Sequence, residues 1–170
     1  RSYGDVWDIV FFQGAYFFCA ADRIFRIENQ QCTVFHPTGF LEHLESVNGR
    51  LLLHAGGKGM LQFKDRDFVP LCAGPPSVVT AMLPWQGDTI LVTTLKNGIY
   101  ALTGDRLLPW STPADVFLKE KRIYAATVFG DRQIALATTL GGLVALNRNR
   151  IPEFWLRKGA GLHFNNILSI

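Results

Sequence analysis

Short apolar runs, separated by glycine or by polar turns, recur along the whole of this 170-residue chain. Several of the runs are continuously apolar instead of alternating, which is typical of strands covered on both faces. No stretch of about 12 residues shows a helical period with capping residues. The pattern predicts an all-β chain of short strands. One group of four is expected over Val79–Pro84, Thr89–Thr94, Ile99–Leu102 and Leu107–Trp110.

An internal repeat underlies these runs. A glycine turn, an apolar strand, a second glycine turn and a second apolar strand occur in three clear copies and one degraded copy. The first glycines of the copies are spaced 35, 38 and 43 residues apart. Four short strands at a period of about 40 residues are typical of a β-propeller blade. The first glycines are Gly14, Gly49, Gly87 and Gly130, and the polar turns between third and fourth strands lie at 28–31, 64–67, 103–106 and 147–150.

The predicted fold is therefore a set of four-stranded antiparallel β-propeller blades. A single blade cannot bury both of its faces, so blades stack around an axis. Four blades followed by one more strand favour an arc of a larger ring, cut from a longer protein, over a complete four-bladed ring. An ordinary sandwich or barrel would explain the strands but not the repeat. The expected blades cover residues 4–39, 40–77, 78–118 and 119–160, and a fifth begins at 161–170.

Composition and charge narrow the class of protein. Hydrophobic residues make up 48% of the chain and charged residues 18%, which excludes a disordered segment. The formal net charge is only +3, without the dense basic clusters expected of a nucleic-acid binder. The longest apolar stretches are too short for a membrane helix, which needs roughly 20 residues. The three cysteines form no CxxC pair, so a zinc ribbon is not expected.

The last two blade junctions resemble a known repeat. The run from Ala135 to Leu146, Ala-Leu-Ala-Thr-Thr-Leu-Gly-Gly-Leu-Val-Ala-Leu, resembles the blade core of the two-component regulator propeller family. The stretch Gly161–Ile170 resembles the start of the next repeat, with His163 where the family usually has proline. The run Val92–Tyr100 fits the core again. The family's usual Trp-Ile-Gly-Thr is replaced by Leu-Val-Thr-Thr and Ala-Leu-Ala-Thr.

This resemblance implies a periplasmic or extracytoplasmic sensor region of a hybrid two-component histidine kinase or a related regulator. Many members of the family sense oligosaccharides, so the resemblance implies a glycan-like ligand and signalling by dimer rearrangement. Kinase, receiver and DNA-binding parts would lie beyond the membrane helix. This segment itself would be a sensor and not an enzyme.

The residues give little support to catalysis. There is no GxSxG motif, no HExxH motif and no CxxC pair, and we expect neither a metal nor a cofactor. The run Gly56–Gly59 lacks the spacing of a phosphate loop and occupies a blade turn. Trp110 and Trp155 hold equivalent places on successive fourth strands, which favours packing between blades over sugar stacking.

The topology of a propeller nevertheless indicates which surface is the better candidate for ligand binding. The turns between second and third strands share one face with the crossovers between blades. The longest crossover precedes Lys119–Arg122, and long loops on rigid scaffolds often carry function. Cationic and amide groups on this face would suit an anionic or hydroxyl-rich ligand. The candidate ligand-binding residues are Arg23, His43, Lys58, Lys96, Asn97, Lys119 and Lys121.

Two other functions stay open. A protein-interaction propeller would be favoured by an exposed apolar patch, and a propeller lyase or glycosidase by clustered acid and base groups near the axis. An incomplete ring would expose unpaired strand edges and apolar faces. We therefore expect either self-association with a second copy or further blades from the parent chain. We expect no nucleic-acid partner and no direct membrane contact from this segment.

Overall fold

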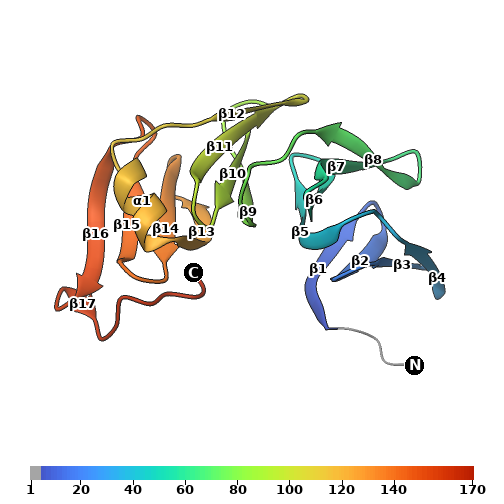
Figure 1. Cartoon of the computed structure of the whole chain (residues 1–170), viewed down its shortest axis with the longest axis horizontal. Helices are drawn as coiled ribbons and strands as arrows, with labels where there is room; N and C mark the ends of the chain where they lie inside the picture. Colours follow the sequence, from blue (N-terminus) through green and yellow to red (C-terminus); the bar gives the residue numbers. More distant parts are fainter. Residues whose placement is uncertain (1–4) are drawn as a thin grey trace. The chain divides into compact units, whose positions relative to one another are not determined.

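A computed structural model describes residues 5–170 and confirms the all-β prediction (Figure 1). The strands form four sheets, each following the order of its strands in the chain. The chain divides into two compact units, unit 1 up to Gly74 and unit 2 from Pro75 to Ile170, and each is described by itself. The expected first residue of blade 1, at position 4, lies outside the described residues.

Unit 1 holds the first two sheets, which we call blade 1 and blade 2. Their facing sides share one apolar core, in which Phe17 of blade 1 and Leu53 of blade 2 are almost completely buried. Blade 1 consists of β1 (Val6–Phe12), β2 (Ala15–Ala20), β3 (Ile24–Glu28) and β4 (Gln31–Phe35). Blade 2 consists of β5 (Phe40–Val47), β6 (Arg50–Gly56), β7 (Gly59–Lys64) and β8 (Asp67–Cys72).

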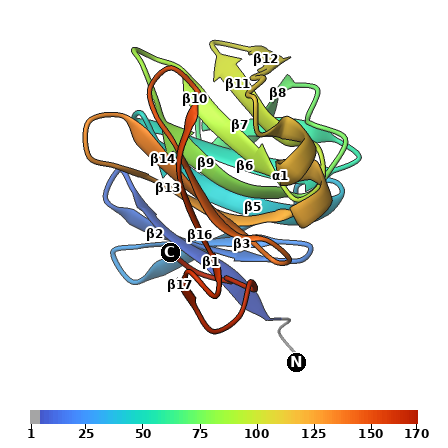
Figure 2. The ribbon, with the colours of Figure 1, turned by 90° about the vertical axis from the view of Figure 1, so that its left-hand side faces the viewer.

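Unit 2 holds blade 3 and blade 4, whose facing sides also share one apolar core. Trp110 and Trp155 both pack in this core, as expected for residues at equivalent places on successive blades. Blade 3 consists of β9 (Val79–Pro84), β10 (Ile90–Thr94), β11 (Gly98–Thr103) and β12 (Arg106–Pro109). The short helix α1 (Asp115–Lys121) lies in the crossover to blade 4 (Figure 2). Blade 4 consists of β13 (Ile123–Phe129), β14 (Gln133–Thr138), β15 (Gly142–Leu146), β16 (Pro152–Lys158) and the two-residue β17 (Gly161–Leu162).

Each first strand carries a β-bulge at the same place. The register between first and second strands skips one residue, which is Trp7 in β1, Glu42 in β5, Thr80 in β9 and Tyr124 in β13. A bulge turns the side chain of the extra residue out of the regular alternation. The bulge therefore gives each blade one side chain that can reach the neighbouring second strand.

The C-terminal segment returns from β16 to the end of β14. Gly161–Leu162 pairs in parallel with β16, and residues 163–170 contain no regular strand. The backbone N–H of Ile167 nevertheless donates to the carbonyl of Thr138 at 3.1 Å. At the start of β5, the N–H of Leu41 donates in a similar way to Ala21 at 2.9 Å.

A glycine substitution at the start of β15 tests how closely β15 packs against β16. Gly142 has a φ of +82°, and a Cβ atom there would collide with the carbonyl oxygen of Leu156. Gly87 also has a positive φ, +56°, but a Cβ atom there would meet nothing within 4 Å. Gly87→Ala should cost about 1 kcal/mol of backbone strain, and Gly142→Ala about 1–3 kcal/mol more. Urea unfolding followed by circular dichroism measures both, and equal losses would contradict the packing of β15 against β16.

Candidate functional site

The crossover helix α1 is fixed by local hydrogen bonds at both ends. Before the helix, the Asp115 carboxylate accepts from the Thr112 backbone N–H at 3.0 Å and from its hydroxyl at 3.1 Å. Leu118 is fully buried in the core of unit 2. At the other end, the carbonyls of Lys121 and Arg122 accept from the N–H groups of Leu140 and Thr139, respectively. The helix is therefore tied to the turn between β14 and β15.

Two glycine turns lie against this helix. The Cε atom of Lys119 lies 3.5 Å from the position of a Cβ atom on Gly98, in the turn between β10 and β11. On Gly141, a Cβ atom would lie 2.6 Å from the Phe117 ring and 2.7 Å from Cγ of Lys121. Only glycine lets the helix approach the second turn this closely. α1 thus brings its two lysines to the ends of two neighbouring blades.

A threonine hydroxyl stabilises each of these turns. The Thr94 hydroxyl donates to the carbonyl of Gly98 at 2.8 Å and accepts from the N–H of Asn97 at 3.0 Å. Thr138 repeats this arrangement with the carbonyl of Gly142 at 2.8 Å and the N–H of Gly141 at 2.9 Å. Buried polar groups that are paired in this way make a rigid turn. The rigid turn holds Lys96 and Asn97 beside α1.

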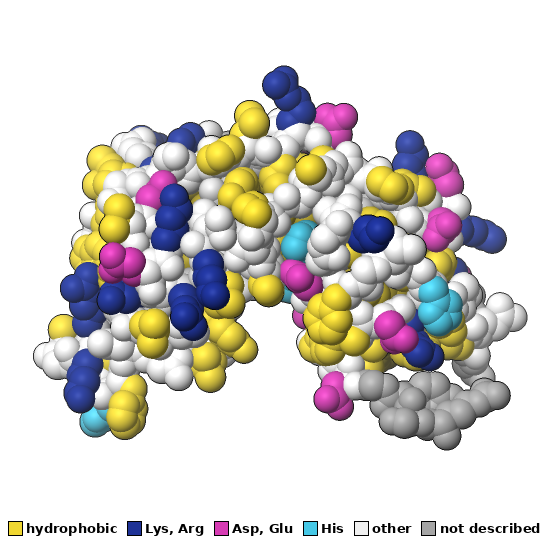
Figure 3. All heavy atoms as spheres, viewed as in Figure 1, with side chains coloured by type: hydrophobic (Ala, Val, Ile, Leu, Met, Phe, Trp, Pro, Cys, Tyr) yellow, Lys and Arg dark blue, Asp and Glu magenta, His cyan; other side chains and the backbone are white. Residues whose placement is uncertain are grey.

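An aromatic pair with a stacked arginine joins the same helix to β16. The rings of Phe117 and Trp155 meet edge to face with centroids 4.6 Å apart. The guanidinium carbon of Arg157 lies 4.5 Å from the Trp155 ring centroid and 5.1 Å from that of Phe117. Figure 3 shows Lys and Arg side chains gathered over α1 and β16. We call this set of cationic, amide and aromatic groups the α1 surface: Lys96, Asn97, Phe117, Lys119, Lys121, Trp155 and Arg157.

The structure thus places two of the four candidate residues of unit 2, Lys119 and Lys121, on α1, and the other two, Lys96 and Asn97, in the β10–β11 turn that Lys119 lies against. The three candidates of unit 1 lie on different elements. Arg23 is in the β2–β3 turn, where it forms a 2.7 Å ion pair with Asp22. Lys58 is in the β6–β7 turn.

His43, unlike the other candidate residues, lies neither in a turn nor in a crossover but within β5. Its Nδ1 atom is 3.6 Å from the Asp8 carboxylate of blade 1. The same Asp8 oxygen accepts the backbone N–H of Leu44 at 2.9 Å. Asp8 therefore links the first strands of the two blades of unit 1 at the position of His43.

His54 is the residue that sequence reasoning missed. It is directly opposite His43 across the β5–β6 pair, and its side chain is almost completely buried. Its Nδ1 atom lies 2.8 Å from the carboxylate of Glu42, the bulged residue of β5. Thr80 makes the same contact with Thr93 at 3.0 Å in blade 3. The bulge thus allows the carboxylate of Glu42 to pair with His54.

Unit 1 concentrates titratable groups where unit 2 has small side chains. The cross-strand pairs directly after the bulged residue of the first strand are Asp8–Cys19 in blade 1 and His43–His54 in blade 2. The corresponding pairs in unit 2 are Ala81–Thr93 and Ala125–Ala137. We call the titratable set in unit 1 the polar layer. It consists of Asp8, Cys19, Glu42, His43, Glu45 and His54.

Burial controls the protonation of the polar layer. Burial lowers the pKa of both His43 and His54, although Asp8 acts against it at His43 and Glu42 at His54. Burial also raises the pKa of the Cys19 thiol to about 12 and raises the pKa of Glu45. The thiol is therefore an inert core group at neutral pH, and the histidines are held neutral.

The polar layer is poorly placed for catalysis. A Cβ atom on Gly74 would lie 2.7 Å from Nε2 of His54, so the backbone of Gly74 closes off the free nitrogen of the Glu42–His54 pair. The Nε2 atom of His43 is buried, without a hydrogen-bond partner within residues 5–170. A general base must lie within hydrogen-bond distance of a substrate proton. Among the described residues, no group of three or more His, Cys, Asp or Glu is arranged to hold a metal ion.

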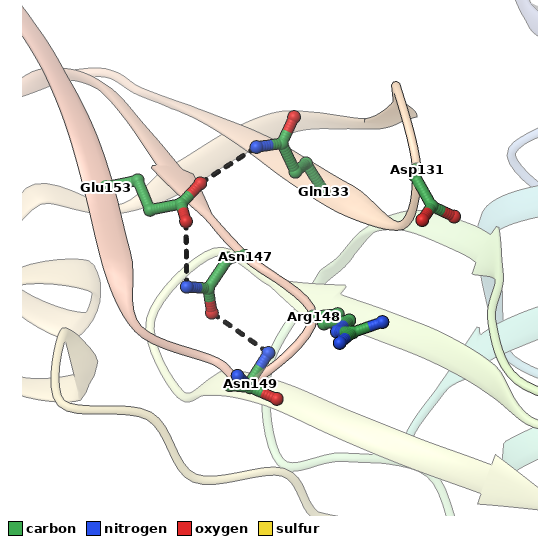
Figure 4. A pocket seen from close by; sticks show the side chains of 6 residues that line it. All are labelled: Asp131, Gln133, Asn147, Arg148, Asn149 and Glu153. Carbon is green, nitrogen blue, oxygen red and sulfur yellow. Dashed lines mark hydrogen bonds between the residues drawn. The ribbon is translucent and has the colours of Figure 1, made fainter.

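A third polar region lies in blade 4, at the ends of its strands that are opposite to the β14–β15 turn and α1. Figure 4 shows Glu153 between two amides, accepting from Gln133 at 2.8 Å and from Asn147 at 2.9 Å. The Asn147 side-chain oxygen in turn accepts from the backbone of Asn149 at 2.9 Å. This network, around a cavity of about 250 Å³, uses its polar groups to hold the β15–β16 turn.

No family model matches the sequence, and no curated protein matches it. Solved structures do match the fold. The extracellular domain of the hybrid two-component system BT3049 from B. thetaiotaomicron superposes with a TM-score of 0.71 and 16% identity, over 94% of this chain and 25% of that chain. The extracellular domain of the one-component system BT4673 from B. thetaiotaomicron gives 0.66 and 17%, over 85% and 20%. The WD40 β-propeller domain of Doa1 gives 0.72 and 10%, over 96% and 56%.

These similarities define the fold as that of β-propeller blades. Two of the three structures are extracellular domains, one of a hybrid two-component system and the other of a one-component system. The chain spans about a quarter of the length of the BT3049 domain. No helix within residues 5–170 is long and apolar enough to cross a membrane.

The lowered histidine pKa values predict a loss of stability in acid. Below the ordinary histidine pKa of about 6.5, the unfolded chain binds protons that the folded chain does not, so stability present above that pH is lost as the pH falls towards the folded-state values. Each histidine can contribute up to about 1.4 kcal/mol per pH unit. The double substitution Glu42→Thr with His54→Thr copies the Thr80–Thr93 pair of blade 3 and should flatten this dependence.

Urea unfolding between pH 8 and pH 5.5 measures the effect. His36→Gln is the matched control, because it removes an exposed histidine from the same unit. An unaltered slope in the double variant would show that His54 is not held neutral.

Proposed function

We propose that this chain is an extracytoplasmic sensor segment of a two-component regulatory protein and that its α1 surface binds a glycan-like ligand. The observation that carries the proposal is that Lys119 and Lys121 of α1 lie against the glycine turns of two neighbouring blades, and that the first of these turns carries Lys96 and Asn97. Cationic and amide donors of this kind fix the hydroxyl or acidic groups of a sugar. The fold shared with the BT3049 and BT4673 extracellular domains supports the sensor assignment.

The signal would travel by rearrangement of a dimer. A ligand shifts an equilibrium between two arrangements only if it binds one of them more tightly. The α1 surface suits this role because α1 lies in a crossover and contacts the turns of two blades. A ligand held between the helix and these turns would favour the arrangement that keeps them together.

Calorimetric titration with neutral and acidic oligosaccharides tests the ligand site. Lys119→Gln and Arg157→Gln each remove one charged donor from the α1 surface. A hydrogen bond to a charged group contributes about 1.5–3 kcal/mol, so each variant should weaken binding by at least about tenfold. Arg148→Gln is the matched control, because Arg148 is an exposed arginine at the opposite turn of the same blade. Equal affinities in all variants, or no binding of any oligosaccharide, would rule out this site.

A specific observation favours a protein-interaction propeller as the second candidate. The face of blade 1 turned away from the unit 1 core carries large apolar side chains. Ile9, Phe11 and Tyr16 are 64%, 58% and 53% exposed. Phe11 and Tyr16 are cross-strand partners with ring centroids 5.0 Å apart, so the exposed surface is continuous. Contiguous exposed apolar surface of this kind marks an interface.

We propose that a second copy of the chain covers this face of blade 1 in solution. Phe11→Glu places a charge at its centre and should lower the mass measured by sedimentation equilibrium towards that of one chain. Val116→Glu is the control, since Val116 is 72% exposed on α1 and belongs to unit 2. A wild-type chain that is monomeric throughout a dilution series would exclude self-association.

A further inference from the structure

The fourth strands of blades 1, 2 and 3 are edge strands, so one row of backbone N–H and C=O groups on each has no strand partner within residues 5–170 (Figure 1). Such an edge can pair with another chain, and proteins usually prevent this with proline, charged side chains or a β-bulge. The outer strands of this chain differ in these features, and the outer strand of blade 1, β4, has none of them.

Proline protects the outer strands of blades 2 and 3 at one equivalent position. Pro70 of β8 and Pro109 of β12 each lie three residues after the residue that closes the hairpin with the third strand. The closing pair of a two-residue hairpin exchanges both of its backbone hydrogen bonds and the pairs then alternate, so an N–H at this position points to the free edge. Proline has no N–H to offer there. In blade 4, β17 pairs with the outer side of β16.

Blade 1 has Val34 at this position. The register of β3 with β4 runs without a shift from the closing pair, Glu28 and Gln31, to the end of β4. By the same alternation, the N–H and C=O groups of Cys32 and Val34 point to the free edge. β4 contains no proline and no charged residue, and its first four residues are exposed. β4 is therefore an accessible edge that can pair with a further strand.

A cavity of about 490 Å³ lies beside the end of β4. It is lined by the last two residues of β4, by residues 36–38 of the crossover and by residues of β7 and β8. Its apolar lining includes Phe35 and Phe68, whose rings meet edge to face with centroids 5.7 Å apart, and the buried Leu61. Among the described lining residues Asp67 is the one acid, and none is Lys or Arg. The cavity therefore suits an apolar side chain with a basic side chain beside it.

We propose that β4 pairs with an extended peptide segment of another protein, which adds a fifth strand to blade 1. A row of alternating backbone donors and acceptors is matched only by another strand, and main-chain hydrogen bonds of this kind give such complexes their affinity. The cavity supplies specificity by taking an apolar side chain of the peptide, and Asp67 favours a Lys or Arg next to it. The α1 surface lies in unit 2, so the two proposals fail independently.

Amide hydrogen exchange, followed by NMR in the intact chain, tests the edge directly. The probe is the capped peptide Lys-Val-Thr-Val-Thr-Val, and the comparison peptide has proline in place of both threonines. The probe should slow exchange at Cys32 and Val34 in a saturable manner, and it should leave Thr33 unchanged because the Thr33 N–H points to β3. No protection at Cys32 and Val34, or equal protection by the proline peptide, would overturn the proposal. Protection without peptide that increases with the concentration of the chain would assign the edge to a second copy and would also overturn it.

Two variants at one position separate backbone pairing from side-chain packing. Val34→Pro copies the proline of blades 2 and 3, removes the N–H that points to the free edge, and should abolish the protection of Cys32. Val34→Thr is the matched control, because it keeps this N–H and the β-branched shape. It should bind the probe within about fivefold of the wild-type affinity. Equal binding by the two variants would contradict pairing through the backbone of β4.

The role of Asp67 is tested with a second peptide, in which glutamate replaces lysine. The Lys peptide should bind the wild-type chain about two- to fivefold more tightly, as is typical of an exposed ion pair. Asp67→Asn should remove this preference, and it keeps the side-chain oxygen that accepts the Phe68 N–H at 2.8 Å. The same preference in both chains would exclude Asp67 from the site.

Discussion

Burial of apolar surface between successive sheets is the constraint on which the structure depends. A four-stranded sheet with apolar residues on both faces is unstable alone in water, and each sheet here has such faces. Phe17 and Leu53 in unit 1, and Leu91 and Leu136 in unit 2, are completely or almost completely buried because one blade covers the next. The turns, the crossover helix and the polar sites all take their positions from this stacking.

Polar groups inside this apolar stack are arranged by two local devices. The first is the threonine that satisfies the backbone of a second-to-third turn, as Thr94 and Thr138 do. The second is the first-strand bulge, which lets Glu42 meet His54 and Thr80 meet Thr93. Both devices pair a buried polar atom within the blade itself. Each blade therefore presents a largely apolar surface to its neighbour, and the stacking of the blades is not disturbed.

The strands and turns could be predicted because their signals are local. The polar turn 103–106, for example, needs a residue that tolerates positive φ, and Gly104 has a φ of +62°. Helix α1 could not be predicted, since seven residues make only about two turns and leave no visible period. His54 was missed because its acid partner lies 12 residues away and meets it only through a bulge. A shift of one residue in strand register exchanges the two faces, so such a pairing is not visible in sequence.

The first-strand bulge also shows how much the side chains at one backbone position can vary. The bulged residue and its second-strand neighbour are Trp7 with Cys19, Glu42 with His54, Thr80 with Thr93 and Tyr124 with Ala137. Four unrelated side-chain pairs thus occupy one backbone arrangement within a single polypeptide. An aromatic, an acid or a hydroxyl can be exchanged there without altering strand order. The sequence identities of 10–17% beside TM-scores of 0.66–0.72 show that this blade fold is compatible with very different sequences.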